Sequence, residues 1–293
     1  MHFTGTIWRP PYEAGSALLQ VTVGCTHHRC RFCSLYQDPF SLSPLSEVKA
    51  DLAELQRFHP HAQRVWLTGA NPFGISETKL TPILQSVRAT LPNVRSIGGF
   101  VRIGDLRRKT DADLARWAEL GVDGLTIGVE SGHDPSLDFM EKGHTAADIV
   151  QQCRRLDAAG IGYYFFYLSG MAGAGRCIEA AQASAETFNQ TKPRIIGVLS
   201  MTLFPDSRLA LDVEQGRFTP AGELERLKEV RELVAGLKIE TFLSTAHVSD
   251  TVHVEGMLPN DRSRILSALD RAIDSCDERA LENLDKSLMS QTK

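Results

Sequence analysis

Segments of strand length and segments of helical period alternate along residues 17–204 of this 293-residue chain. The strand candidates are mainly apolar runs of strand length, whereas the segments between them repeat apolar residues every three or four positions, as amphipathic helices do. The predicted strands are residues 17–23, 64–68, 94–101, 124–129, 162–168 and 194–201, and the predicted helices are residues 44–58, 77–90, 110–120, 145–159 and 176–189. This alternation predicts an α/β fold with a parallel sheet, either curled into an open barrel or doubly wound.

The alternation ends after Pro205. Two further helices are predicted at residues 219–237 and 259–272, with irregular or extended chain at residues 240–254 between them. No linker rich in proline, glycine or serine separates this part from the rest, so we expect a core and an extension that pack as one domain. Their expected bounds are residues 1–205, of which 1–16 form a lead segment, and residues 206–293.

The composition is that of an ordinary globular chain, with 42% hydrophobic residues and a formal net charge of -4 at pH 7. Nonspecific binding of nucleic acid requires a clear basic surplus, so we expect no nucleic-acid partner. The chain contains no run of eighteen apolar residues, and its first residues lack the charged and apolar segments of a secretory signal. We therefore expect a cytoplasmic protein that does not enter a membrane.

Three cysteines, Cys25, Cys30 and Cys33, lie within nine residues directly after the first predicted strand. In parallel α/β folds, ligands bind beyond the carboxyl ends of the strands, so this loop lies on the expected functional edge. Clustered thiolates in a cytosolic protein favour a metal ion or an iron–sulfur cluster over a disulfide framework. Three cysteine ligands leave one coordination position of the metal site or cluster open, and a small molecule can bind there and accept an electron.

The cysteine loop resembles that of the radical S-adenosylmethionine (radical SAM) enzymes. Those enzymes place C-x3-C-x2-C after the first strand of a partial (β/α)6 barrel, with an aromatic residue before the last cysteine. This chain has the same loop position, the final C-x2-C and the aromatic Phe32, but four residues separate Cys25 from Cys30. A plant-type [2Fe-2S] ferredoxin shares the C-x4-C-x2-C spacing, but it needs a fourth cysteine and usually has a small β-rich fold. The resemblance implies a partial (β/α)6 TIM-like barrel with a C-terminal helical extension, in a subgroup with the longer spacing.

Further matches to the family follow the later predicted strands in the expected order. Residues 68–72 lie where the family has a turn whose backbone oxygens meet the methionine amino group of SAM. Residues 127–132 resemble a fourth-strand segment whose polar residues approach SAM. Residues 168–175 and 199–205 resemble the ends of the fifth and sixth strands. The SAM contacts expected from this resemblance are Phe32, Gly69, Ala70, Asn71, Arg102, Glu130, Ser131, Gly170, Met201 and Leu203.

Three of these residues have an alternative structural role. Arg102 can pair with the SAM carboxylate or, equally, with Asp105. Glu130 ends an apolar run, so its carboxylate needs a buried partner such as an amine or a ribose hydroxyl. Ser131 can contact SAM or cap the following turn. A separate polar group in the C-terminal part can supply substrate contacts or form a solvated loop; it consists of His247, Ser249, Asp250, His253 and Glu255.

The resemblance implies that Cys25, Cys30 and Cys33 bind a [4Fe-4S] cluster and that SAM is cleaved to a 5'-deoxyadenosyl radical. We expect an enzyme that modifies a small-molecule substrate and receives its electron from a reducing partner such as flavodoxin or ferredoxin. One alternative is an electron-transfer or metal-binding protein with a [2Fe-2S] cluster or zinc. Another is an enzyme on the same scaffold that transfers a methyl or aminocarboxypropyl group from SAM. The sequence identifies neither a catalytic residue nor the substrate.

Overall fold

The computed structural model describes residues 1–276, so residues 277–293 of the predicted extension lie outside the described part. The chain forms two compact units. Unit 1 consists of Met1–His28, Ser34–Gly128 and Gln152–Tyr164, and unit 2 consists of Arg29–Cys33, Val129–Gln151 and the chain from Phe165 onward.

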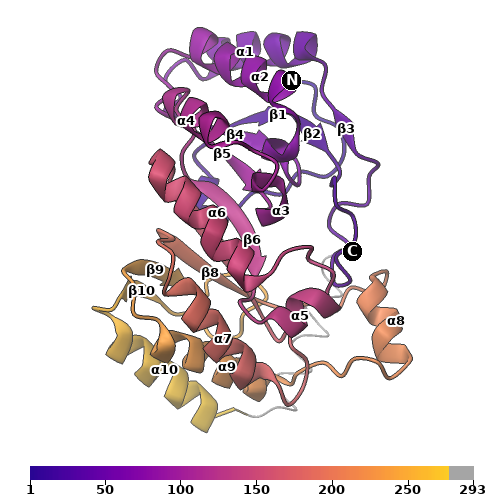
Figure 1. Cartoon of the computed structure of the whole chain (residues 1–293), viewed down its shortest axis with the longest axis vertical. Helices are drawn as coiled ribbons and strands as arrows, with labels where there is room; N and C mark the ends of the chain where they lie inside the picture. Colours follow the sequence, from indigo (N-terminus) through magenta and orange to yellow (C-terminus); the bar gives the residue numbers. More distant parts are fainter. Residues whose placement is uncertain (277–293) are drawn as a thin grey trace. The chain divides into compact units, whose positions relative to one another are not determined.

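Unit 1 contains the first strands of the parallel sheet and the helices that follow them (Figure 1). Its strands are β1 (Ala17–Gln20), β2 (Thr22–Val23), β3 (Ser41–Leu42), β4 (Arg64–Thr68), β5 (Ser96–Val101) and most of β6 (Leu125–Glu130). Its helices are α1 (Leu45–Phe58), α2 (Glu77–Thr90), α3 (Ile103–Leu106), α4 (Asp111–Glu119), most of α6 (Ala146–Ala159) and the 3-10 turns η1 (Pro11–Glu13) and η2 (Pro72–Gly74). Neighbouring strands are parallel, with Leu18 opposite Trp66 and Phe100 opposite Thr126.

The core of unit 1 includes the three apolar residues at the centre of β4. Val65, Trp66 and Leu67 are fully buried, and the Trp66 ring meets Phe100 edge-on with 5.2 Å between centroids. Full burial of each such side chain contributes about 1.5–3 kcal/mol. Helices α1 and α2 lie side by side over this part of the sheet (Figure 1).

Unit 2 contains the last strands of the sheet and the C-terminal helices. Its strands are most of β7 (Tyr163–Ser169), β8 (Ile195–Ser200), β9 (Thr241–Ser244) and β10 (Glu255–Leu258). Its helices are α5 (Asp134–Phe139), α7 (Cys177–Phe188), α8 (Arg208–Glu214), α9 (Glu223–Gly236) and α10 (Arg262–Asp274). Strand β9 is parallel to β8 and antiparallel to β10, while α9 packs against both α7 and α10 (Figure 1).

The order of the strands follows the order of the sequence, as consecutive βα units require. Among the described residues the larger sheet runs β1-β4-β5-β6-β7-β8-β9-β10, and β2 and β3 form a separate pair. All six predicted strands and all five predicted helices of the core are present. Helix α4 begins at a capping box, because the Thr110 hydroxyl accepts the N–H of Asp113 at 3.1 Å and the Asp113 carboxylate accepts the N–H of Thr110 at 2.9 Å.

Some local expectations were wrong. The predicted strand at 17–23 is broken at Val21, because β2 leaves the parallel sheet and pairs antiparallel with β3. The short helices α3, α5 and α8 were not predicted, since segments of four to seven residues carry too little periodicity. None of the helices within residues 1–276 combines the length and the apolar character needed to cross a bilayer.

Candidate cofactor site

The loop after β2 carries the three clustered cysteines. None of them is in a disulfide, and all three are partly exposed. The N–H of Cys33 donates to the carbonyl of Cys30 at 3.2 Å, which closes a turn around Phe32. Accessible, unbridged thiols fit the donor chemistry of an iron–sulfur cluster. Within residues 1–276 no three His, Cys, Asp or Glu side chains are gathered to hold a metal ion, so the three-thiolate site stays a prediction.

In unit 1, the turn after β4 depends on Gly69. Its φ of 121° is unfavourable for other residues, and a Cβ there would lie 1.9 Å from Oγ1 and 2.7 Å from the carbonyl oxygen of Thr22. A side chain is therefore excluded where the end of β4 meets β2. Ala70, the next residue, is partly exposed.

Asn71, another predicted SAM contact, is fully buried and ties this turn to the cysteine loop. Its Oδ1 accepts the N–H of Thr26, the residue after Cys25, at 3.3 Å, and its Nδ2 hydrogen-bonds the Thr26 hydroxyl. The same Nδ2 donates to Oδ2 of Asp105 at 2.8 Å. Arg102 extends the group, with its Nη1 3.8 Å from Oδ1 of Asp105. The ion pair considered as an alternative for Arg102 is thus present, and a contact with SAM stays a prediction.

In unit 2, the structure brings Phe32 and Glu130 together through Lys142. The Lys142 ammonium donates to Oε1 of Glu130 at 3.1 Å and lies 5.6 Å from the centroid of the Phe32 ring. Both charged side chains are largely buried, with 6% of Lys142 and 15% of Glu130 exposed. Lys142 is therefore the buried amine that the Glu130 carboxylate was expected to need. Glu130 also has a φ of 62°, an uncommon backbone conformation that often marks a functional position.

Gly170 and Met201 also lie together in unit 2. A Cβ built on Gly170 would be 3.8 Å from that of Met201, and the N–H of Met201 donates to the carbonyl of Ser169 at 2.9 Å. Leu203 follows as a partly exposed residue. Ser131 has the capping role, because its hydroxyl accepts the N–H of His133 at 3.1 Å.

Sequence reasoning missed a buried carboxylate on α9. Oε2 of Glu229 accepts the N–H of Gly170 at 2.6 Å, and Oε1 accepts the hydroxyl hydrogen of Tyr167 at 2.5 Å. Burial raises the pKa of Glu229 to about 7. Glu229 precedes the buried Leu233 by one helical turn, so the two share a helix face. A carboxylate on this apolar face was the signal in the sequence that indicated a buried acid.

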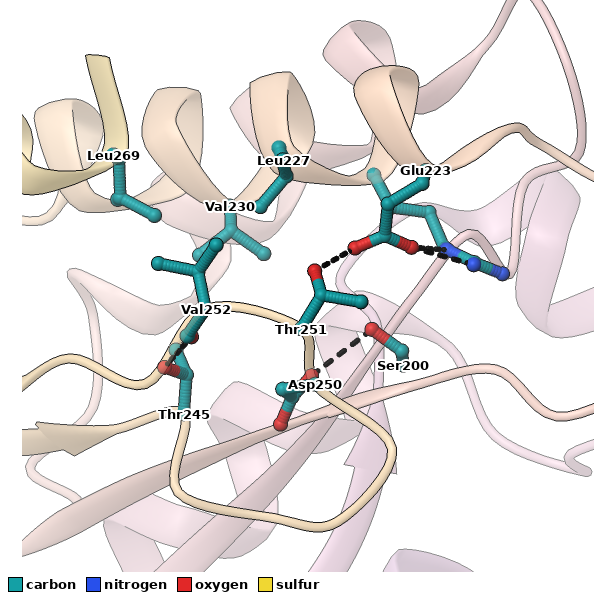
Figure 2. A pocket seen from close by; sticks show the side chains of 10 residues that line it. Ser200, Glu223, Leu227, Val230, Thr245, Asp250, Thr251, Val252 and Leu269 are labelled. Carbon is teal, nitrogen blue, oxygen red and sulfur yellow. Dashed lines mark hydrogen bonds and ion pairs between the residues drawn. The ribbon is translucent and has the colours of Figure 1, made fainter. Parts of the chain in front are cut away.

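The polar loop after β9 contacts the end of β8 rather than an open site. Oδ1 of Asp250 accepts the Ser200 hydroxyl hydrogen at 2.9 Å, and the Ser249 hydroxyl accepts the N–H of Ser200 at 3.0 Å. Figure 2 shows Ser200 and Asp250 among the side chains that line a cavity. The volume of this cavity is about 10 Å³, enough for roughly one water molecule. Burial raises the pKa of Asp250 to about 7. This cavity is too small for an organic substrate.

A parallel α/β sheet that carries a three-cysteine loop and glycine turns after its strands defines a class of enzymes that bind a cofactor at the carboxyl edge. A profile described as the Radical SAM superfamily matches residues 19–173, which is more than half of the chain. The chain belongs to the Radical SAM superfamily. No curated protein matches the sequence.

Three solved structures illustrate the fold. The radical SAM methyltransferase TsrM from Kitasatospora setae, with cobalamin and a [4Fe-4S] cluster bound, has a TM-score of 0.57 and 17% identity over 69% of this chain and 39% of its own. Coproporphyrinogen III oxidase (HemN) from Escherichia coli has a TM-score of 0.56 and 13% identity over 75% and 51% of the two chains. Methylornithine synthase (PylB) has a TM-score of 0.51 and 16% identity over 92% and 85%. The chain therefore spans about two fifths of the methyltransferase.

These findings confirm the fold class and the superfamily. The protein is an enzyme with a partial TIM-like barrel, and its cofactors are a [4Fe-4S] cluster and SAM. Radical SAM chemistry acts on a substrate and needs a reductant. The subgroup suggested by the C-x4-C-x2-C spacing stays a prediction.

Proposed function

We propose that Cys25, Cys30 and Cys33 bind the [4Fe-4S] cluster and that the enzyme modifies a small organic substrate. The observation that carries this proposal is the presence of three unbridged, partly exposed thiols within nine residues, after the first strands of a superfamily barrel. When bound, the cluster and SAM supply a 5'-deoxyadenosyl radical through one-electron cleavage of a carbon–sulfur bond. Binding, orientation and exclusion of water are the work of the protein.

Among the proposed SAM contacts, unit 1 contains Gly69, Ala70, Asn71 and Arg102. Unit 2 contains Phe32, Glu130, Ser131, Gly170, Met201 and Leu203. The buried bonds of Asn71 to Thr26 support a role in holding the chain beside Cys25. The contact of Lys142 with both Glu130 and the Phe32 ring supports a fixed orientation for those two side chains.

We also infer that the core (1–205) and the extension (206–293) belong to one domain. Two contacts within unit 2 support this inference. Glu229 of α9 accepts the N–H of Gly170, and the N–H of Leu209 in α8 donates to the carbonyl of Arg31 at 2.8 Å. A cytoplasmic location and a flavodoxin or ferredoxin as the reductant complete the proposal.

Anaerobic reconstitution tests the cluster and SAM together. We expect iron and sulfide near four per chain, an electron paramagnetic resonance (EPR) spectrum of the reduced protein that changes when SAM is added, and 5'-deoxyadenosine after reduction. Tightly bound zinc, a two-iron cluster, or a four-iron cluster indifferent to SAM would contradict the proposal.

Product analysis separates the transferase alternatives. Release of S-adenosylhomocysteine indicates methyl transfer, and 5'-methylthioadenosine indicates transfer of the aminocarboxypropyl group. The similarity to TsrM shows only the fold, so it does not favour methyl transfer for this chain. We expect 5'-deoxyadenosine as the nucleoside product.

A further inference from the structure

The residue between Cys30 and Phe32 is held by the C-terminal part of the chain. We propose that Asp212 and Glu141 are positioning residues for the iron–sulfur cluster, which they act on through Arg31. Arg31 directly follows Cys30, so fixing it fixes the C-x2-C half of the cysteine loop. The inference rests on the proposed function, in which Cys30 and Cys33 are cluster ligands.

The backbone of this half-loop is bonded on both sides of Cys30. The N–H of Arg31 donates to the carbonyl of Met140 at 3.1 Å, and the carbonyl of Arg31 accepts the N–H of Leu209 at 2.8 Å. Leu209 lies in the first turn of α8, where N–H groups have no partner inside the helix. Before Cys30, the carbonyl of Arg29 accepts a hydrogen bond from Nη1 of Arg208 at 3.1 Å.

The Arg31 side chain joins two carboxylates that lie far apart in the sequence. Its Nη1 donates to Oδ2 of Asp212 at 2.9 Å, and its Nη2 lies 2.9 Å from Oε1 of Glu141. The guanidinium carbon is also 5.3 Å from the centroid of the Phe139 ring. A rigid guanidinium fork with five N–H donors can serve two carboxylates at once, whereas a lysine ammonium presents a single point charge.

Both carboxylates are held in turn by a second arginine. Oδ1 of Asp212 accepts from Nε of Arg217 at 2.8 Å and from its Nη2 at 2.5 Å. Glu141 binds Arg208 through both oxygens, at 2.7 Å and 3.0 Å. We call these five residues the arginine–carboxylate chain. Its order is Arg217, Asp212, Arg31, Glu141 and Arg208.

Asp212 is the most deeply buried member of the arginine–carboxylate chain, since its side chain is fully buried. Its neighbours Arg217 and Arg31 hold the pKa of the Asp212 carboxyl below its usual value. A buried carboxylate cannot leave its cations without a large loss of stabilisation. Movement of Arg31, and with it of the adjacent Cys30, is therefore restricted. Such restriction favours cluster binding, because the cysteine ligands must be held at fixed distances.

The test compares D212N and E141Q with the wild type and with a matched control. D270N removes a carboxylate that also binds an arginine, because Oδ1 of Asp270 accepts from Nε of Arg231 across α9 and α10. After anaerobic reconstitution we expect the wild type and D270N to hold about four irons per chain. We expect D212N and E141Q to hold at most half as much iron, with part of it in a three-iron form visible by EPR of the oxidised protein.

Circular dichroism and thermal unfolding accompany each measurement, because a general loss of folding would also lower iron content. If D212N does not fold, E141Q decides the question, since the Glu141 side chain is already 32% exposed. Full iron content and a wild-type EPR spectrum in the folded variants would overturn the inference while leaving the proposed function intact. Failure of the wild type to bind a four-iron cluster would instead overturn the proposed function.

Discussion

Glu229 accepts the backbone N–H of Gly170, with 2.6 Å between Oε2 and the nitrogen. This bond joins the end of β7 to a helix that lies beyond residues 19–173, the part of the chain that matches the superfamily profile. The loop that begins at Gly170 extends to Gly175, and the same helix, α9, contacts this end as well, because Glu225 accepts the N–H of Gly175 at 2.6 Å. The conformation of a proposed SAM-binding loop is thus set by this chain's own extension.

The buried Glu229 carboxyl makes stability depend on pH. Burial raises its pKa from 4.5 to about 7 in the folded state, so the folded state binds the proton more tightly than the unfolded state does. The resulting stabilisation is fully present below pH 4.5 and is lost as pH rises through about 7. The shift corresponds to about 3 kcal/mol. We expect the free energy of unfolding in urea to fall between pH 5 and 8, and E229Q to reduce this fall.

A matched control for E229Q is E232Q on the same helix, since Glu232 makes an exposed hydrogen bond to Gln182. Asp250 also has a pKa raised to about 7 by burial and contributes in the same direction. The fall in the free energy of unfolding between pH 5 and 8 should therefore be smaller in E229Q and smaller still in the double variant E229Q/D250N. It should be unchanged in E232Q. An E229Q profile identical to that of the wild type would contradict this account.

Replacing Gly69 by alanine should disrupt the turn after β4. The new Cβ would meet Thr22 at 1.9 Å, and the φ of 121° adds backbone strain. We expect a loss of about 3 kcal/mol in the free energy of unfolding. G160A is the matched control, because Gly160 also has a positive φ of 73° but nothing lies within 4 Å of its Cβ position. The control should lose about 1 kcal/mol, from backbone strain alone; equal losses would refute the steric argument.

The three clustered cysteines should act as a set in cluster binding. We expect C25A, C30A and C33A each to lose most of the iron after reconstitution, because three thiolates leave no spare ligand. C276A is the control, since Cys276 is also partly exposed but lies outside the cluster loop. Iron content and the visible absorption spectrum provide the measurement. Normal iron in any one of the three single variants would exclude that cysteine as a ligand.

Removing the charge of only one member of the Lys142–Glu130 pair should lower the free energy of unfolding. Both side chains are largely buried, so K142M leaves a carboxylate without its amine and should destabilise the protein by about 3 kcal/mol. The double variant with E130Q removes both charges and should recover much of that loss. A double-mutant cycle on the free energy of unfolding measures the coupling. Additive effects would show that the two residues do not stabilise each other.

Much of the fold could be predicted because its determinants are local. Apolar strand runs and helical periods predicted every long helix of the core and every core strand of the parallel sheet, but not the two-residue strand β3. The positions of Gly69 and Gly170 after their strands were also predicted, but not why glycine is needed at Gly69. That reason is the close approach of Thr22, forty-seven residues earlier in the chain.

The sequence by itself determined the order of the βα units, the cysteine triplet and the superfamily, since each depends on residue type and spacing along the chain. Only the tertiary structure decided which distant residues support the site. Arg31 meets Asp212, and Gly170 meets Glu229, across separations of 181 and 59 residues. No local period encodes such pairs, because a buried carboxylate finds its donor only when the sheet and the extension pack together.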